Sequence, residues 1–74
     1  MVQEPSLDEQ IKEAQRELAL RKSVFPKWVA TGRLKQNDAD HRIAAQAAIL
    51  GTLLTVRRVC EVLEEEAAKN ADAR

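Results

Sequence analysis

The chain has little of what disulfide-stabilised or membrane-inserted proteins use. Its 74 residues include one cysteine, one phenylalanine, one tryptophan, one histidine and no tyrosine, with two glycines and two prolines. A single cysteine excludes a disulfide framework within the chain, which favours a reducing compartment, the cytoplasm. The longest apolar run, Ile43 to Val56, is interrupted by polar residues, so we expect no membrane span. The acidic N-terminus has no apolar segment, so we expect no signal peptide.

Catalytic groups are also scarce. Cys60 and His41 fall on one expected helix, nineteen positions apart in the sequence, so about 28 Å would separate them within a chain, too far for a nucleophile and its base. One cysteine and one histidine cannot complete a tetrahedral zinc shell. Gly32 and Gly51 stand alone and do not form a phosphate-binding loop. We therefore expect no enzymatic activity, no metal and no cofactor.

The charges are balanced in number but not in position. The formal net charge is zero, yet acidic residues predominate in 1–15 and 61–74, whereas basic residues predominate from 16 to 42. The basic residues of this middle segment are Arg16, Arg21, Lys22, Lys27, Arg33, Lys35 and Arg42. A neutral total thus contains a local positive field that favours anionic partners.

A first helix is expected to begin near Leu7. Ser6 and Glu9 have the spacing of a capping box. The apolar positions that follow recur at spacings of about four and three, as on one face of an amphipathic helix; they are Leu7, Ile11, Ala14 and Leu18. This stripe is narrow and suits packing against one other helix.

The segment 23–42 holds most of the unusual side chains and predicts a corner. Pro26 disfavours helical geometry in the residue before it, so the first helix should stop or kink at 22–25, with a short turn over 26–31 as the alternative. Gly32 is the residue expected in the left-handed conformation after a helical C-terminus. Phe25 and Trp28 then lie close together beside this corner.

A second, longer helix is expected from about Gln36 to Lys69, with Lys35 or Asn37 near its N-cap. At 1.5 Å per residue this helix is roughly 50 Å long, about twice the first. Asp38 and Asp40 lie in its first turn, where carboxylates favour the helix dipole. It carries two apolar stripes, which suggests two packing partners; they are Ile49, Leu53, Val56, Cys60, Leu63 and Ala67, and Ala39, Ile43, Leu50 and Leu54.

These elements predict an all-α fold: a short helix, a Pro/Gly corner and one long helix, forming a helical hairpin that assembles into a homo-oligomeric bundle. A domain of this size buries little surface alone, and the first helix is too short to cover the second. The expected oligomer interface is Ile49, Leu53, Val56, Cys60 and Leu63. We expect residues 1–5 to be disordered, 6–69 to form the single domain, and 70–74 to be a frayed tail.

A motif at the corner resembles a known group of proteins. The pattern L-A-x-R-x-x-V-F-P-x-W-V-x-x-G-R-L, at 18–34, is followed by A-D-x-x-I-A-x-x-x-A-I-L at 39–50. It resembles small accessory proteins encoded by tailed phages and prophages of Gram-negative bacteria, most without assigned function. Lys35 departs from the Ser or Thr expected there as a helix cap, and the C-terminal third lies outside the resemblance. The resemblance covers about residues 17–54, half the chain, and implies a phage accessory protein but no mechanism. Small phage proteins without catalytic residues often act by stoichiometric binding, and we expect this one in the cytoplasm of the bacterial host.

Several interpretations of the corner stay open. In one, the aromatic residues only form a small core that turns the chain. In another, an anionic, nucleotide-like ligand binds a basic and aromatic pocket between subunits, so that the protein sequesters a nucleotide signal of host defence. The residues expected to bind it are Lys27, Trp28, Arg33, Lys35 and Arg42; carboxylates at the same helix start, Asp38 and Asp40, oppose it.

Two other partners follow from the same surface. The corner or the long helix is alternatively the docking surface of an inhibitor that binds a host defence or regulatory protein, since aromatic and Arg side chains are typical interface anchors. A DNA-binding accessory protein is the third interpretation. We do not expect duplex DNA to bind, because the second helix is long and Ala-rich and both ends of the chain are acidic.

Overall fold

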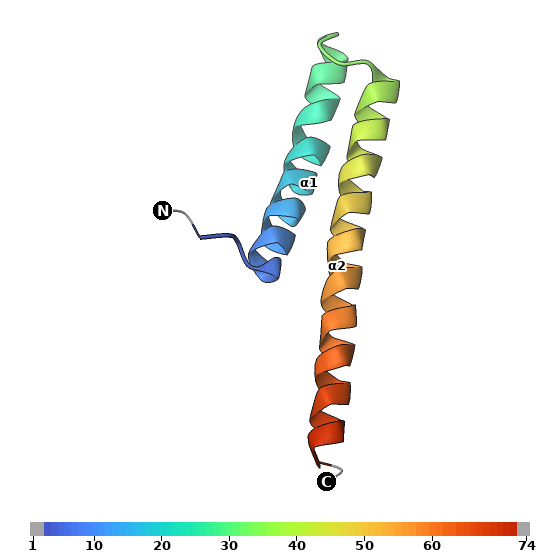
Figure 1. Ribbon diagram of the computed structural model, residues 1–74. Coiled ribbons are helices and arrows are strands. Elements are labelled where there is room, and N and C mark those ends of the chain that lie inside the picture. The colour runs from blue at the N-terminus through green and yellow to red at the C-terminus, as the bar shows by residue number, and fades with distance from the viewer. Residues whose placement is uncertain (1–2, 73–74) are drawn as a thin grey trace.

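Two helices packed side by side form the whole of the described fold. The computed structural model describes residues 3–72, and within this range it contains α1 (Leu7–Ala30) and α2 (Gln36–Asp72) and no strand. The helices run in opposite directions and are joined by residues 31–35, as Figure 1 shows. The molecule measures 65 × 31 × 14 Å, so it is a single layer two helices wide. The all-α helical hairpin predicted from the sequence is confirmed.

The N-terminus of α1 is capped by Ser6, as the first half of the predicted capping box requires. The hydroxyl of Ser6 accepts a hydrogen bond from the backbone N–H of Glu9 at 3.1 Å, which satisfies one of the free donors of the first turn. The side-chain amide of Gln10 donates to the carbonyl of Pro5 at 3.2 Å. These two contacts fix the point at which the chain enters the helix.

Pro26 lies inside α1 and does not end it. The helix continues to Ala30, so the predicted stop at 22–25 is wrong, and the turn predicted over 26–31 is the last part of α1 itself. Pro26 removes the donor that the carbonyl of Lys22 would receive in a regular helix. Phe25 is buried next to it, with 3% of its surface exposed, so local packing stabilises a helical segment that the residue type disfavours. Helix α1 has 24 residues and α2 has 37, so α2 is less than twice as long as α1, whereas the sequence predicted about twice the length.

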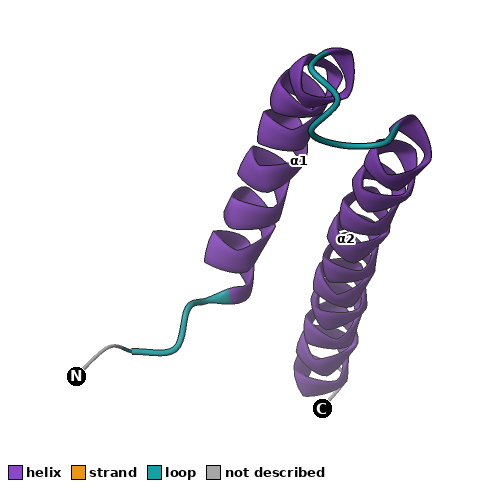
Figure 2. Cartoon of the chain, turned by 90° about the horizontal axis from the view of Figure 1, so that it is seen from above, coloured by secondary structure: helices purple, strands orange, loops and turns teal. Residues whose placement is uncertain are grey.

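The corner is a Schellman motif built on Gly32. Gly32 has a φ of 76°, and its N–H donates to the carbonyl of Val29 at 3.1 Å, while the N–H of Arg33 donates to the carbonyl of Trp28 at 2.8 Å. These are the paired bonds that close a helix through a left-handed residue. Figure 2 shows the short connection crossing from the end of α1 to the start of α2. The role predicted for Gly32 is confirmed.

Helix α2 starts without a side-chain cap. Its first turn is closed by the backbone carbonyl of Lys35, which accepts from the N–H of Ala39 at 2.9 Å, so Lys35 occupies the N-cap position and offers no side-chain acceptor. The helix is continuous through Gly51 and reaches Asp72, beyond the predicted end at Lys69. The segment 70–72 of the expected frayed tail is thus helical, and residues 73–74 lie outside the described residues. Residues 1 and 2, which belong to the segment expected to be disordered, also lie outside the described residues.

Few side chains are buried between the helices. The buried residues are Ile11, Ala14, Phe25, Ala39 and Gln46. The stripe predicted on α1 faces α2, with Leu7 and Leu18 half-buried at either end of it. On α2 the stripe of Ala39, Ile43, Leu50 and Leu54 is buried or half-buried, and α1 is the helix that covers it. The core of one chain is therefore small.

The C-terminal part of α2 extends beyond α1. Arg57 of α2 pairs with Asp8 at the start of α1, with 3.5 Å between Nη1 and Oδ1, and α2 continues for four turns past this point (Figure 1). We call residues 61–72 the overhang. Every side chain from 61 to 71 is exposed, and Glu61 and Glu64 line a hollow together with Ser6, Leu7 and Asp8 at the start of α1.

By length and composition, α2 also meets the requirements of a membrane span. A window of 18 residues within Gln36–Ala71 has a mean hydropathy of 1.3 and is 6% buried. The expectation that the chain holds no segment long and apolar enough to span a bilayer is therefore wrong on these two criteria. They do not separate a membrane span from the central helix of a water-soluble bundle.

Candidate functional site

An aromatic pair stands at the end of α1, next to the corner. Phe25 and Trp28 are three residues apart, so the helix places them on the same face. Their ring centroids are 5.6 Å apart and the ring planes differ by 30°, which is a stacked arrangement within the preferred range. Phe25 is buried and Trp28 is 36% exposed. One ring is thus anchored in the core and supports a second ring that solvent reaches.

Two guanidinium groups lie against these rings, one on each. The Cζ of Arg42 is 4.9 Å from the centroid of Phe25, and the Cζ of Arg33 is 5.9 Å from the centroid of Trp28. Both distances are those of cation–π contacts. The Schellman motif brings Arg33 back to Trp28, since it bonds the backbones of these two residues directly. Arg42 comes from the second turn of α2, so both helices contribute to the cluster.

Arg21 joins the helices beside this cluster. Its Nε donates to Oε1 of Glu17 at 2.8 Å, and its Nη1 donates to the backbone carbonyl of Arg42 at 3.0 Å. The second bond spans the interface between α1 and α2, and it engages Arg21 as a structural residue. From the sequence, Arg21 was expected only to contribute positive charge, and no local pattern reveals a bond to a carbonyl of another helix.

The other predicted ligand-binding cations do not lie over the aromatic rings. Lys27 and Lys35 are exposed, and the cation–π contacts of Phe25 and Trp28 are made by Arg42 and Arg33. Among residues 3–72, no carboxylate lies within 4 Å of Lys27, Arg33, Lys35 or Arg42. Of the five predicted residues, the structure brings together Trp28, Arg33 and Arg42, and it adds Phe25 as their support.

A hollow of about 270 Å³ opens beside the cluster. Its walls are mostly apolar, and two arginines lie at its rim; the lining residues are Glu17, Leu20, Arg21, Val24, Phe25, Trp28 and Arg42. Arg33, Lys27 and Lys35 lie outside this lining. The hollow therefore joins the exposed ring of Trp28 to the guanidinium of Arg42, and it is open to solvent along one side of the hairpin.

The two carboxylates predicted to oppose an anionic ligand, Asp38 and Asp40, lie at the start of α2. Asp40 accepts a hydrogen bond from the side-chain amide of Gln36 at 2.8 Å, which holds its carboxylate along the first turn of α2. Asp38 is exposed in the same turn. Neither residue lines the hollow beside Trp28.

No protein-family model, curated protein or solved structure matches this chain. The resemblance to phage accessory proteins stays a prediction. Within residues 3–72 there is no group of three or more His, Cys, Asp and Glu side chains that would hold a metal ion.

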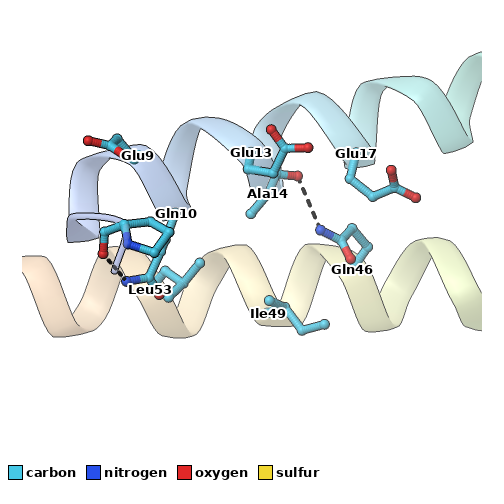
Figure 3. A pocket seen from close by; sticks show the side chains of 9 residues that line it. Glu9, Gln10, Glu13, Ala14, Glu17, Gln46, Ile49 and Leu53 are labelled. Atoms are coloured by element: carbon cyan, nitrogen blue, oxygen red, sulfur yellow. Dashed lines mark hydrogen bonds between the residues drawn. The ribbon is translucent and has the colours of Figure 1, made fainter. Parts of the chain in front are cut away.

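A second hollow, which the sequence did not indicate, lies on the same side of the hairpin. Its volume is about 620 Å³, and Glu17 lines both hollows. Figure 3 shows Glu9, Glu13 and Glu17 along α1, above Gln46 and Ile49 of α2. This hollow is acidic at its rim and apolar at its base. A helical spacing of four residues between the glutamates was a usable signal, because it places all three on one face.

The residues predicted for an oligomer interface divide into two groups. Leu53 is half-buried in the acidic hollow beside α1, whereas Cys60 is exposed. Ile49, Val56 and Leu63 are exposed, at 52%, 44% and 62% of their surfaces. These apolar side chains are available to a partner, and the assembly itself stays a prediction.

Proposed function

We propose that this protein is a non-enzymatic binding protein whose corner sequesters an anionic nucleotide-like ligand. The observation that carries the proposal is the cluster of Phe25, Trp28, Arg33 and Arg42. An exposed ring on a buried support offers a stacking surface for a base, and two guanidinium groups next to it offer hydrogen bonds to phosphate oxygens. Each of these groups is what a nucleotide requires.

The charges around the corner support an anion more than a cation. Lys27, Arg33, Lys35 and Arg42 have no carboxylate within 4 Å among the described residues, so their charge is not neutralised by local ion pairs. A cluster of unpaired cations attracts phosphate by several kT at low ionic strength. The hollow of one chain is shallow, which supports a pocket that a second subunit completes.

The biological role proposed rests on the resemblance of residues 18–50 to phage accessory proteins. In that setting, a small protein without catalytic groups acts by stoichiometric binding. Sequestering a nucleotide second messenger would then antagonise the antiviral defence of the bacterial host. We propose the bacterial cytoplasm as its location, since nucleotide signals of this kind act there.

The single tryptophan allows a direct test. Since the chain has one Trp and no Tyr, fluorescence excited at the red edge of the indole band reports only on Trp28. A panel of linear and cyclic nucleotides should include one that quenches this emission in a saturable way. Arg33→Gln and Arg42→Lys should each weaken that binding about tenfold or more, since each removes or alters a charge-assisted bond.

The matched control is Lys12→Gln, because Lys12 is an exposed cation of α1 that does not line either hollow. This variant should bind the ligand as the natural chain does. If no nucleotide changes the emission or releases heat in calorimetry, the proposal fails. An equal loss in the Lys12 variant would also contradict it, because binding would then depend on net charge alone.

The second candidate function is an inhibitor that docks on a host defence or regulatory protein. The exposed apolar side chains of α2 and the exposed ring of Trp28 favour it, because such groups are typical of interface centres. This protein would ignore nucleotides and would copurify with one host protein in a defined ratio. A DNA-binding accessory protein is the third candidate, and retardation of a DNA duplex at moderate salt would place it first.

A further inference from the structure

The exposed apolar side chains of α2 form a continuous stripe. Ile49, Val56, Val59 and Leu63 are all exposed, and their spacings of seven, three and four place them on one side of the helix. The stripe begins beside the acidic hollow, which Ile49 lines, and continues into the overhang. It is therefore a second packing face of α2, next to the face that α1 covers.

The surface beside this stripe is acidic at one end and basic at the other. Near the corner, Arg33, Lys35 and Arg42 outnumber the carboxylates Asp38 and Asp40. At the other end, Glu61, Glu64, Glu65 and Glu66 outnumber Arg57, Arg58 and Lys69, which pair with Glu61 and Glu66. On α1, Glu9 and Glu13 line the acidic hollow, Arg21 lines the hollow beside the corner, and Glu17 lines both. Both helices thus show the same polarity along the hairpin.

This polarity selects between the two ways in which a second copy can pack on the stripe. A parallel pair would place the glutamates of one overhang against those of the other, and the two basic corners against each other. Like charges held together in this way oppose association. An antiparallel pair would place each acidic overhang beside the basic corner of the other copy. The dipoles of the two α2 helices would then point in opposite directions, which is also favourable.

We propose that two copies of this chain pack their α2 helices antiparallel through Ile49, Val56, Val59 and Leu63, with the overhang of each copy beside the corner of the other. In this pair, residues 64–66 of one copy lie level with residues 33–35 of the other along the direction of the helices. The two-fold axis that relates the two copies then passes close to Ile49, which is midway between these segments in the sequence. Val56 and Leu63 of one copy then lie beside Arg42 and the exposed side chains of Leu20 and Trp28 of the other. The overhang of each copy gains a partner.

This arrangement does not depend on the identity of any ligand. It deepens the proposed function in one respect, because it supplies the second subunit at the corner. The glutamates of that subunit and an anionic ligand then compete for the same cations. A nucleotide should loosen the contacts at the two ends of the pair and leave the central contact between the two Ile49 side chains in place.

Distances between spin labels test the direction of packing. A label on Cys60, the only cysteine, should give a separation of about 33 Å between copies, from 1.5 Å of rise per residue on either side of Ile49. A label on Lys69→Cys in a Cys60→Ser chain should give about 60 Å. A parallel pair would give roughly 10–20 Å at both sites, the width of two packed helices, and would overturn the proposal.

The charge pattern is tested by exchange of signs. Glu64→Lys with Glu66→Lys, at the two flanks of the stripe, should weaken self-association at least about tenfold at low salt, as measured by sedimentation equilibrium. Adding Arg33→Glu and Lys35→Glu to the same chain should restore it, and Lys12→Glu should leave it unchanged. A monomer at all concentrations would overturn the proposal, as would flotation of the monomer with phosphatidylcholine–phosphatidylglycerol vesicles, which would assign the stripe to lipid.

Discussion

The side-chain amide of Gln46 donates a hydrogen bond to the backbone carbonyl of Ala14 at 3.2 Å, across the interface between α2 and α1. Gln46 is 7% exposed, so this polar side chain is held in the small core among apolar neighbours (Figure 3). A buried amide that finds a partner is compatible with stability, and one that loses it is costly. The bond therefore fixes the register of the two helices.

Replacing this side chain should destabilise the hairpin. Gln46→Ala removes the bond and leaves space between the helices, and we expect the free energy of unfolding to fall by about 2 kcal/mol. Urea denaturation followed by circular dichroism measures it, at one fixed protein concentration because self-association adds to stability. Gln15→Ala, an exposed position of α1, is the control and should change little. Equal effects in both variants would contradict the structural role of Gln46.

The two glycines should respond to alanine in opposite ways. Gly32 has a φ of 76°, so Gly32→Ala should cost about 1 kcal/mol through strain in the left-handed conformation. Gly51 lies within α2, and an added Cβ would meet nothing within 4 Å, so Gly51→Ala should stabilise by about 0.5–1 kcal/mol. Thermal denaturation of the two variants side by side checks both signs. A stabilised Gly32→Ala variant would show that the corner is not closed as described.

The N-cap of α2 can be improved. Lys35 occupies this position without a side-chain acceptor for the free N–H groups of the first turn, so Lys35→Ser should stabilise the chain by about 0.5–1 kcal/mol. Lys35→Ala is the matched control, because it removes the same charge and adds no acceptor. The difference in midpoint between the two variants isolates the cap. No difference would mean that water already satisfies these donors equally well.

Pro26 should be a source of instability within α1. Pro26→Ala restores a donor for the carbonyl of Lys22 and removes the ring that crowds the preceding turn, so the free energy of unfolding should rise by about 1–3 kcal/mol. Chemical denaturation and the helical signal at 222 nm measure the change. A loss of stability would show that the proline ring itself packs in the folded protein. Its side chain is exposed, which argues against that result.

Much of the architecture follows from local signals in the sequence. Ser6 before an amphipathic stripe set the start of α1, and Gly32 set the turn after it, because caps and left-handed residues act within a few positions of the chain. The end of α1 was not predictable in the same way. A proline is judged by its local cost, and that cost is offset here by the burial of Phe25, which depends on a second helix.

The candidate site divides along the same line. Charge and aromatic content alone indicated Trp28, Arg33 and Arg42, and these three do come together. Phe25 as the buried support of Trp28, and Arg21 as a tie between the helices, depend on which residues α2 presents to α1. Lys27 and Lys35 were indicated by charge in the same way and make no cation–π contact with the rings, because charge specifies no direction.

By itself, the sequence determined that this protein is a hairpin of two unequal helices with a positively charged corner, because helical periodicity, caps and charge are properties of neighbouring residues. Only the tertiary structure decided that α1 continues through Pro26, that Gln46 is buried against Ala14, and that Arg42 lies on Phe25. The contacts of Gln46 and Arg42 join residues that are remote in the sequence. The continuation of α1 depends on whether the burial of Phe25 offsets the local cost of Pro26. Such balances are settled by packing, which no local pattern contains.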